Sequence, residues 1–398
     1  MHVLYIHKAF PPQFAPLARA LARTVGWKNT FLSRKPDQTL EELTNIQYDA
    51  PEQEEKAWDR AFAQQLQHSI GVAEAVRRHR LKPDLVVAHS GFGSSHLLPS
   101  RLECPVINYF EYFTKPLCND LLERREWRHP AWYYDWRRTA NAMTLLDLQA
   151  CTSGYSPTQW QRSTFPLEYQ QKIKVLFDGV DTATFTPRPE KVARQFRNFE
   201  IGPNTRIVTY VARGLEAVRG FDIFMQVAKR IYTARPDTIF LVAGKDRVCY
   251  GTDLELIGRE SFKQWVLEQD DYDLSKLHFL DWLPVEELVQ LFHLSDLHIY
   301  LTTPFVLSWS LFNALACGTT VLAADVEPVR EVVRDGVNGL LADLHDRDGL
   351  AARALEVLAD PCAFHPLGQK SAREIEANYS MNVVLPKFIR YFSKTAGR

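Results

Sequence analysis

The sequence predicts two doubly wound α/β domains, each built on a parallel sheet covered by helices. Short apolar runs of strand length alternate with longer amphipathic patterns along the chain. The chain has 398 residues, more than one hydrophobic core usually supports. The alternation also starts twice, once at residue 2 and again near residue 205, so we expect one domain for each series.

The first series occupies the N-terminal half of the chain. From Trp58 onward, apolar side chains recur at every third or fourth position, which indicates an amphipathic helix that ends before Pro83. Residues 140–150 are expected to form a helix that leads into a short strand near 151–152. The other predicted elements are a helix at 16–24 and buried strands at 2–6, 85–88 and 105–110.

The second series has the same alternation. Between the two series, residues 179–189 contain two prolines and no helical pattern, which indicates a linker. We therefore divide the chain into a domain at 1–185 and a domain at 186–379. The second domain is predicted to have strands at 207–212, 239–244, 277–280, 297–301 and 320–323, and helices at 221–232, 285–294, 310–317 and 329–333.

The composition is that of a water-soluble globular protein, with 46% hydrophobic and 24% charged residues. A formal net charge of -1 gives no electrostatic reason to expect a nucleic-acid partner. No apolar run has the roughly 20 residues that a membrane-spanning helix needs, and we expect no signal peptide. The six cysteines are scattered without a CxxC pair, so we expect neither a disulfide framework nor a zinc site, and a reducing cytoplasm fits.

Two arginines lie in the predicted loop after the strand at 207–212, in the sequence V-A-R-G-L-E-A-V-R-G-F. Loops at the carboxyl edge of a parallel sheet are where such domains bind ligands. Arg213 and Arg219 could hold a diphosphate through charge-assisted hydrogen bonds, and Gly214 and Gly220 would allow the backbone to approach it. The alternative is a pair of solvated surface arginines, and in either case we expect both side chains at the surface.

A second candidate stretch is P-F-V-L-S-W-S-L-F-N-A-L-A-C-G-T-T-V. It places Ser308 and Ser310 at the start of the predicted helix and Gly318 at its end, as N-cap and C-terminal residues should be. Free amides at a helix N-terminus attract phosphate. A capped helix with no ligand explains the same residues.

Together these two stretches resemble the donor domain of the retaining glycosyltransferase family 4, which has the GT-B fold. The family typically has G-R-x-x-x-x-K-G in the first loop, where the arginine and lysine bind the donor diphosphate; here Arg219 stands where lysine is usual. The sequence A-L-A-C-G-T-T-V-L also matches closely, and P-V-R-E-V-V-R-D-G-V-N-G-L-L and V-L-F-D-G-V-D-T-A-T-F-T-P resemble flanking family segments. The resemblance is good over roughly 150 to 365.

The family's E-x-x-x-x-x-x-x-E motif is missing, because its two positions fall on Phe305 and Asn313. By resemblance, the second glutamate holds the donor ribose and the first contacts the sugar or assists its departure. Asn313 can still hydrogen-bond a hydroxyl, whereas Phe305 cannot replace a carboxylate. Either backbone amides at 306–308 hold the sugar or catalysis is weakened. The expected donor-binding residues are Arg213, Gly214, Arg219, Val306, Ser308, Trp309, Ser310 and Asn313.

The resemblance implies two Rossmann-like domains that face each other across a cleft, with a C-terminal helix, 380–398, that crosses back to the N-terminal domain. The N-terminal domain would supply the acceptor side. Glu111 follows a predicted strand and is our candidate catalytic carboxylate, together with Arg213 and Arg219; a surface salt bridge is its alternative. The glycines after His89 lack the third glycine of a dinucleotide-binding fingerprint and more often form a plain turn.

The segment 124–138 is rich in arginine and aromatic residues. Aromatic faces stack on sugars, but a packed aromatic cluster with a solvated basic face explains the segment as well. We expect an acceptor or interdomain role here. The predicted acceptor-side residues are His89, Gly91, Trp127 and Trp132.

The expected activity is transfer of a sugar, with retention, from a nucleoside diphosphate sugar to a glycan, a lipid-linked or a small-molecule acceptor. We expect no cofactor, no metal ion and no nucleic-acid partner, and a cytoplasmic location with peripheral contact to the inner face of the membrane as an option. Rival interpretations are a catalytically impaired GT-B subunit that binds partners, a sugar-nucleotide 2-epimerase and a nicotinamide dehydrogenase. The sequence leaves the donor, the acceptor and the oligomeric state open.

Overall fold

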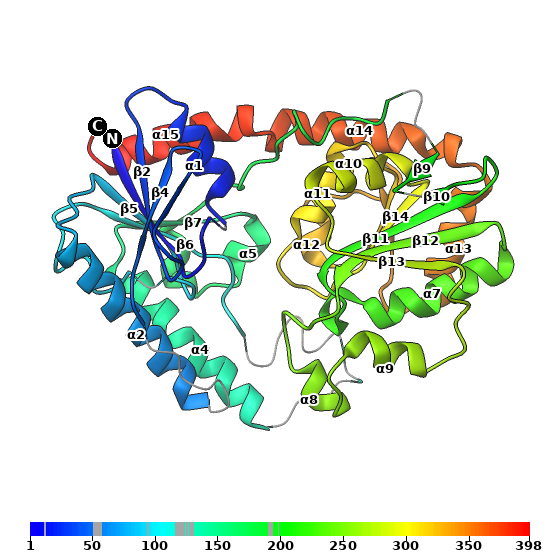
Figure 1. Cartoon of the computed structure of the whole chain (residues 1–398), viewed down its shortest axis with the longest axis horizontal. Coiled ribbons are helices and arrows are strands. Elements are labelled where there is room, and N and C mark those ends of the chain that lie inside the picture. The colour runs from blue at the N-terminus through cyan, green and yellow to red at the C-terminus, as the bar shows by residue number, and fades with distance from the viewer. Residues whose placement is uncertain are drawn as a thin grey trace. The chain divides into compact units, whose positions relative to one another are not determined.

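The computed structural model describes residues 1–398 except 12, 51–57, 94, 116–123, 125, 127–130, 190–193 and 198 (Figure 1). The chain divides into two compact units. The N-terminal unit comprises Met1–Cys118, Pro130–Gly179 and Tyr379–Arg398, and the C-terminal unit comprises Asn119–His129 and Val180–Asn378. The chain therefore passes between the units within the predicted linker, and a short segment inside the first half belongs to the second unit.

The N-terminal unit contains an eight-stranded sheet in the order β3-β4-β2-β1-β5-β6-β7-β8. All neighbouring strands are parallel except β3 and β4. The strands predicted at 2–6, 85–88 and 105–110 are confirmed, and the one expected near 151–152 begins two residues later. The strands are β1 (His2–Ile6), β2 (Lys28–Ser33), β3 (Gln38–Leu40), β4 (Leu43–Gln47), β5 (Leu85–His89), β6 (Val106–Tyr109), β7 (Ser153–Ser156) and β8 (Ile173–Val175).

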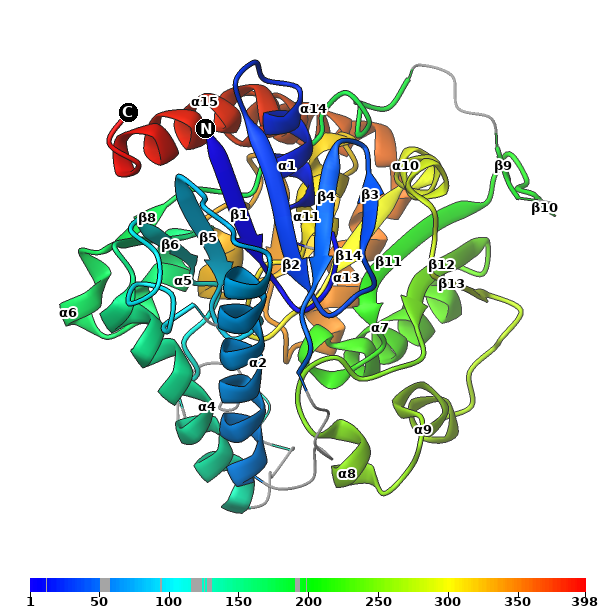
Figure 2. The ribbon, with the colours of Figure 1, turned by 60° about the vertical axis from the view of Figure 1, so that its left-hand side comes forward.

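The helices of this unit include α2 (Trp58–Arg78) and α4 (Ala131–Ala150), which lie side by side (Figure 2). The prediction that the second helix starts at 140 is wrong by nine residues. Tyr133 and Trp136, three positions apart on one helical face, stack with their ring centroids 5.5 Å apart. The aromatic residues therefore support a longer helix. The shorter helices are α1 (Ala15–Ala22), α5 (Gln159–Ser163) and α6 (Leu167–Gln170).

The C-terminal helix α15 (Met381–Thr395) packs on the N-terminal sheet, as predicted. Its buried Phe388 and Phe392 join the same hydrophobic cluster as Val3 and Tyr5 of β1, whose alternate residues face the opposite cluster. The Tyr391 hydroxyl lies 2.8 Å from Ser153 Oγ and 3.0 Å from the Gly154 carbonyl oxygen, both on β7. The last helix thus completes the core of the first unit.

The C-terminal unit contains a six-stranded, fully parallel sheet in the order β13-β12-β11-β14-β15-β16. The strand order reverses between β11 and β14, and ligands of doubly wound sheets bind at the carboxyl ends of the strands at such a switch point. All five predicted strands are confirmed. The strands are β11 (Arg206–Gly214), β12 (Thr238–Lys245), β13 (Leu277–Asp281), β14 (Leu297–Tyr300), β15 (Val321–Ala324) and β16 (Leu340–Ala342); β9 (Gln195–Phe196) and β10 (Phe199–Glu200) form a separate ribbon.

Of the four helices predicted for the C-terminal unit, those at 221–232, 285–294 and 310–317 are confirmed, and the one expected at 329–333 is displaced. That helix is α12 (Glu327–Arg330), which starts earlier because Pro328 occupies the first turn, where proline is favoured. The confirmed helices are α7 (Phe221–Ala234), α10 (Val285–Leu294) and α11 (Trp309–Ala316). The helices that were not predicted are η1 (Ala217–Arg219), α8 (Asp253–Ile257), α9 (Phe262–Glu268), α13 (Arg347–Ala359) and α14 (Pro361–Tyr379).

Candidate donor site

The carboxyl end of β11 contains a β-bulge. Val211 pairs with Ala243, whereas Gly214 pairs with Lys245, so β11 has one extra residue between these pairs. The Arg213 side chain, in this bulge, is exposed. Five residues separate Arg213 from Arg219, one more than in the family pattern.

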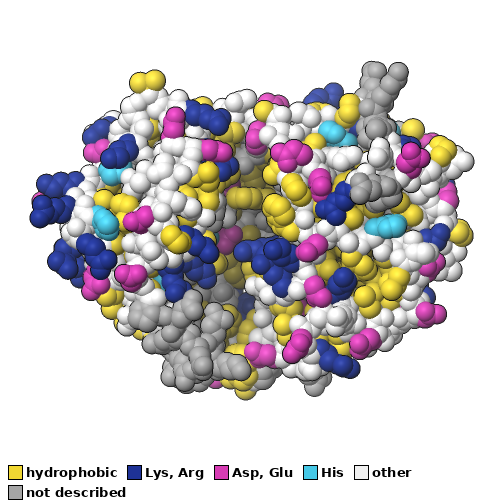
Figure 3. Space-filling view, in the orientation of Figure 1, with side chains coloured by type: hydrophobic (Ala, Val, Ile, Leu, Met, Phe, Trp, Pro, Cys, Tyr) yellow, Lys and Arg dark blue, Asp and Glu magenta, His cyan; other side chains and the backbone are white. Residues whose placement is uncertain are grey.

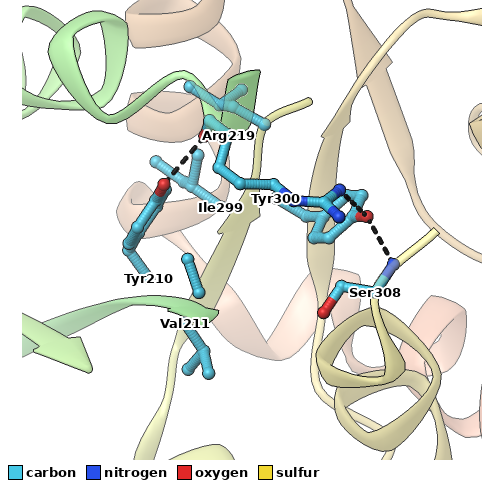
Figure 4. Close-up of a pocket in the computed structure, with 8 residues that line it drawn as sticks. Tyr210, Val211, Arg219, Ile299, Tyr300 and Ser308 are labelled. Atoms are coloured by element: carbon cyan, nitrogen blue, oxygen red, sulfur yellow. Dashed lines mark hydrogen bonds between the residues drawn. The ribbon is translucent and has the colours of Figure 1, made fainter. Parts of the chain in front are cut away.

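Arg219 is at the end of η1 and is buried, with 6% of its surface exposed. Our expectation that both motif arginines lie at the surface is therefore wrong for Arg219. Its Nη1 donates to Thr302 Oγ1 at 3.0 Å and to the Val306 carbonyl oxygen at 2.9 Å. The same nitrogen lies 3.4 Å from the Tyr300 hydroxyl (Figure 4). These acceptors follow or end β14, so Arg219 joins the two strands of the switch point.

Aromatic rings pack beside the Arg219 guanidinium. Its Cζ lies 5.3 Å from the ring centroid of Phe305 and 5.5 Å from that of Tyr250, and the two rings are 4.9 Å apart. These distances are typical of cation–π contacts. All three hydrogen bonds of the guanidinium come from Nη1, so Nε and Nη2 make none with the residues that the structure describes. These two nitrogens can form a bidentate fork toward a phosphate.

Ser308, directly before α11, is the N-cap residue of this helix. Ser308 Oγ accepts from the Ser310 amide at 3.2 Å, and the Ser308 amide donates to the Tyr300 hydroxyl at 3.0 Å. Ser310 Oγ donates to the Val211 carbonyl oxygen at 3.2 Å, which ties the helix to β11. Two amides expected to face a phosphate thus have partners inside the protein, and their role in ligand binding stays a prediction. Trp309, between the serines, is 40% exposed.

A small hollow lies between β11 and β14, with about 210 Å³ of empty space. Tyr210 lines this hollow and donates from its hydroxyl to the Arg219 carbonyl oxygen at 2.8 Å (Figure 4). Ligand pockets usually measure ~300–1,000 Å³, so this hollow is too small to hold a whole nucleotide sugar. Its lining residues are Tyr210, Val211, Ala212, Arg219, Ile299, Tyr300, Leu301 and Ser308.

The remaining predicted donor residues differ in role. Asn313, on α11, is half-buried, and its side chain makes no hydrogen bond with the described part of the chain, so it is available to a ligand. Val306 contributes its carbonyl group to Arg219. Position 214 requires glycine for packing, because a Cβ at this position would lie 2.4 Å from the Arg247 carbonyl oxygen.

The structure places His89 and Glu111 together in the N-terminal unit. His89 ends β5, is 2% exposed, and has its Nε2 3.4 Å from Glu111 Oε2. Glu111 follows the neighbouring strand β6. The sequence analysis missed His7, whose ring lies 5.3 Å from that of His89; its position directly after β1 could have indicated it.

Gly91 has φ +83° and open space around it, as expected for a turn that requires a left-handed residue. Trp132, on the first turn of α4, is 41% exposed, and Trp127 lies outside the described residues.

On the face shown in Figure 3, Asp and Glu side chains lie among the Lys and Arg side chains. Within the described part of the chain, no group of three or more His, Cys, Asp or Glu residues could hold a metal ion, and no helix is long and apolar enough to cross a membrane.

The two doubly wound units match solved structures with the GT-B fold along almost their whole length. Sucrose-phosphate synthase from Thermosynechococcus elongatus has a TM-score of 0.79 at 15% identity, with 99% of this chain and 98% of that chain covered. The Anabaena protein Alr3699/HepE in complex with UDP-glucose has a TM-score of 0.72 at 13% identity, with 99% and 100% covered. The catalytic domain of starch synthase IV from Arabidopsis thaliana, bound to ADP and acarbose, has 0.69 at 12%, with 100% and 99% covered. The protein therefore has the GT-B fold.

Two consecutive family models match the sequence: the glycosyl transferase family 4 group over residues 25–185 and the glycosyl transferases group 1 over residues 192–380. The chain belongs to the group 1 glycosyltransferases of family 4.

Relatives of known name match only part of the chain. The D-inositol 3-phosphate glycosyltransferase of Mycolicibacterium vanbaalenii is 28% identical over 229 residues, 55% of this chain and 48% of that protein. The enzyme of the same name from Mycobacterium sp. strain JLS is 31% identical over 176 residues, 44% of this chain and 37% of that protein. The matched region thus spans half or less of these relatives.

Proposed function

We propose that the protein is a retaining glycosyltransferase that takes a sugar from a nucleoside diphosphate sugar bound by the C-terminal unit. The observation that supports this most directly is Arg219. Its guanidinium is buried at the switch point of a doubly wound sheet, fixed through Nη1, and left with two nitrogens for a ligand. A buried, preorganised cation of this kind stabilises negative charge far better than a solvated one.

In the proposed reaction, Arg219 and the exposed Arg213 hold the donor diphosphate and stabilise the charge that develops on it as the glycosidic bond breaks. The departing phosphate oxygen takes the acceptor proton on the same face, so the anomeric configuration is retained and no separate base is needed. Asn313 hydrogen-bonds the ribose. The two arginines supply the positive charge, and we propose that the reaction requires no metal ion.

The acceptor is a glycan, a lipid-linked or a small molecule, bound by the N-terminal unit. His89 and Glu111 are the proposed acceptor residues, because their 3.4 Å contact at the carboxyl ends of adjacent strands can orient a hydroxyl group. The relatives named above transfer sugar to D-inositol 3-phosphate, and the Anabaena structure contains UDP-glucose. The UDP-glucose of the Anabaena structure and the ADP of the Arabidopsis structure favour a nucleoside diphosphate sugar as the donor class.

Calorimetric titration with UDP-glucose, ADP-glucose and GDP-mannose, with and without EDTA, tests the donor assignment. We expect one of them to bind with an affinity that EDTA leaves unchanged. Donor hydrolysis in the absence of acceptor distinguishes an active transferase from a subunit that only binds, and NMR of the product's anomeric proton tests retention. If none of the three binds, the donor-site proposal is wrong.

A further inference from the structure

Glu216 is a buried carboxylate in the loop between Arg213 and Arg219. Its side chain has no exposed surface, although the loop is short and lies next to the proposed diphosphate site. Its Oε2 accepts hydrogen bonds from the backbone amides of Cys249 and, at 2.9 Å, Tyr250. Glu216 therefore ties the segment that follows β12 to the loop that follows β11.

This tie holds the backbone amide of Tyr250. The Tyr250 ring packs against Phe305 and beside the Arg219 guanidinium. The two loops approach so closely that a Cβ on Gly214 would lie 3.1 Å from Cys249 Sγ. Glu216, three residues before Arg219 in the chain, thus binds the backbone of the residue whose ring packs beside the Arg219 guanidinium.

The second carboxylate oxygen, Oε1, is buried and makes no hydrogen bond with the described residues. A buried charged oxygen without a hydrogen bond raises the free energy of the ionised carboxylate, so protonation of this group becomes easier. Burial raises the pKa of Glu216 to about 7, against the opposing effects of the Tyr250 and Cys249 amides and of Arg219.

Several titratable groups surround this carboxyl. Asp253, on α8, accepts from the Ala217 amide at 2.7 Å, and burial raises its pKa to about 6. Arg219 is the cation that acts on Glu216 most strongly. The other charged or titratable groups nearby are Tyr210 on β11, Arg213, Arg247 and Cys249 after their strands, Asp222 on α7 with its partner Arg124, and the tyrosines Tyr250 and Tyr300.

We propose that Glu216 is a positioning residue of the donor site, and that its free oxygen Oε1 takes up a proton from solvent when the diphosphate of a nucleotide sugar binds beside Arg219. The inference rests on the proposed function. A diphosphate brings negative charge to the cation that Glu216 faces, and a nearby like charge disfavours the ionised carboxyl. The carboxylate becomes a carboxylic acid, while Oε2 continues to accept from the two amides. By linkage, the protonated protein then binds the ligand more tightly.

Calorimetric titration between pH 6 and 8.5 tests this with whichever of UDP-glucose, ADP-glucose and GDP-mannose binds. The pyrophosphate of these sugars has no group that titrates in this range. We expect the affinity of the wild-type protein to fall about three- to tenfold from pH 6 to 8.5, since one pKa unit corresponds to a factor of about ten. At pH 7.5, titrations in two buffers of different ionisation enthalpy should show net proton uptake.

Glu216→Gln keeps the size of the side chain and an oxygen that accepts from the amides, but it cannot ionise. We expect its affinity to be independent of pH and its proton uptake to be lost. Asp253→Asn is the matched control, because it removes the neighbouring buried carboxyl, and it should keep the pH dependence.

A pH-independent wild-type affinity without proton uptake overturns the inference even if no variant folds. The same slope in Glu216→Gln, or loss of the slope only in Asp253→Asn, overturns it as well. These outcomes leave the proposed function intact. If none of the three nucleotide sugars binds the wild-type protein, the proposed function fails and the inference fails with it.

Discussion

Replacing Arg219 with alanine should affect both folding and ligand binding, whereas replacing Arg213 should affect binding alone. Arg219 is 6% exposed and donates to Thr302 and Val306, and its guanidinium packs beside two aromatic rings. Arg213 is exposed. One motif thus contains a buried and an exposed arginine, and comparison of the two alanine variants separates the effect on folding from the effect on ligand binding.

The magnitude follows from these contacts. Losing two good hydrogen bonds from a charged donor, one longer contact and the cation–π packing should lower the free energy of unfolding by about 2–4 kcal/mol for Arg219→Ala. Arg213→Ala should stay within about 0.5 kcal/mol of wild type, as exposed substitutions usually do. Each variant should weaken nucleoside diphosphate binding by about 1.5–3 kcal/mol, roughly ten- to 150-fold. Arg219→Lys, which keeps the charge without the fork, should be intermediate in both quantities.

Urea denaturation gives the stabilities, and calorimetric titration at a temperature where circular dichroism shows both variants folded gives the affinities. A folded Arg219→Ala protein that binds the nucleotide as tightly as wild type would refute the assignment of Arg219 to the diphosphate. Equal destabilisation by both alanine variants would refute the contrast between a buried and an exposed arginine.

Three further predictions concern stability. Burial raises the pKa of Glu216 from its ordinary value to about 7, so the folded state binds one more proton than the unfolded state between about pH 4.5 and 7. As the pH rises through this window, the free energy of unfolding of the wild type should therefore fall by up to about 3 kcal/mol relative to that of Glu216→Gln. Urea denaturation of both proteins at pH 5 and 8 measures this difference. Arg124→Ala, which leaves the Asp222 carboxylate without its buried partner, should cost the C-terminal unit about 3–5 kcal/mol in the same assay. Phe388→Ala should cost the N-terminal unit about 3–5 kcal/mol, while the exposed Lys387→Ala should leave it unchanged; equal stability of these two variants would contradict the packing of α15 on this unit.

The fold class could be predicted because buried parallel strands are continuous apolar runs. β5, β6 and β14 are buried at every residue, and all three were found. Strand β3 was missed because all of its residues are exposed at the sheet edge, so it has no apolar face to indicate it. Strand β4 was missed because it is only partly buried and its alternation of buried and exposed residues is short. The turn before it uses Glu41 and Glu42 at positive φ, where glycine would have indicated a turn in the sequence.

The site was predicted in its components and not in its arrangement. The charge of Arg219 is visible in the sequence, but its burial depends on acceptors more than 80 residues away, one of them a backbone carbonyl group. Glu216 was not singled out, because its partners are amides 33 and 34 residues away, which any sequence supplies. The contact between His89 and Glu111 could have been predicted from the sequence, since both residues end or follow neighbouring strands of a parallel sheet.

Asn313→Glu restores the charge that the family has at this position, and its effect depends on what surrounds Asn313. The side chain is half-buried on α11 and makes no hydrogen bond with the residues that the structure describes, so nothing inside the protein has to be broken to replace it. A glutamate there can reach water, and it can accept from both ribose hydroxyls through charge-assisted bonds about twice as strong as neutral ones. We therefore expect an unchanged melting temperature and a nucleotide affinity that holds or rises by up to about fivefold, roughly 1 kcal/mol.

Asn313→Gln is the control, because it adds the same length without charge and should bind like wild type. If Asn313→Glu lowers both the melting temperature and the affinity while Asn313→Gln does not, the carboxylate is being buried without a partner. The ribose would then lie elsewhere, and the interpretation of this chain as a binding subunit would take precedence over that of an active transferase.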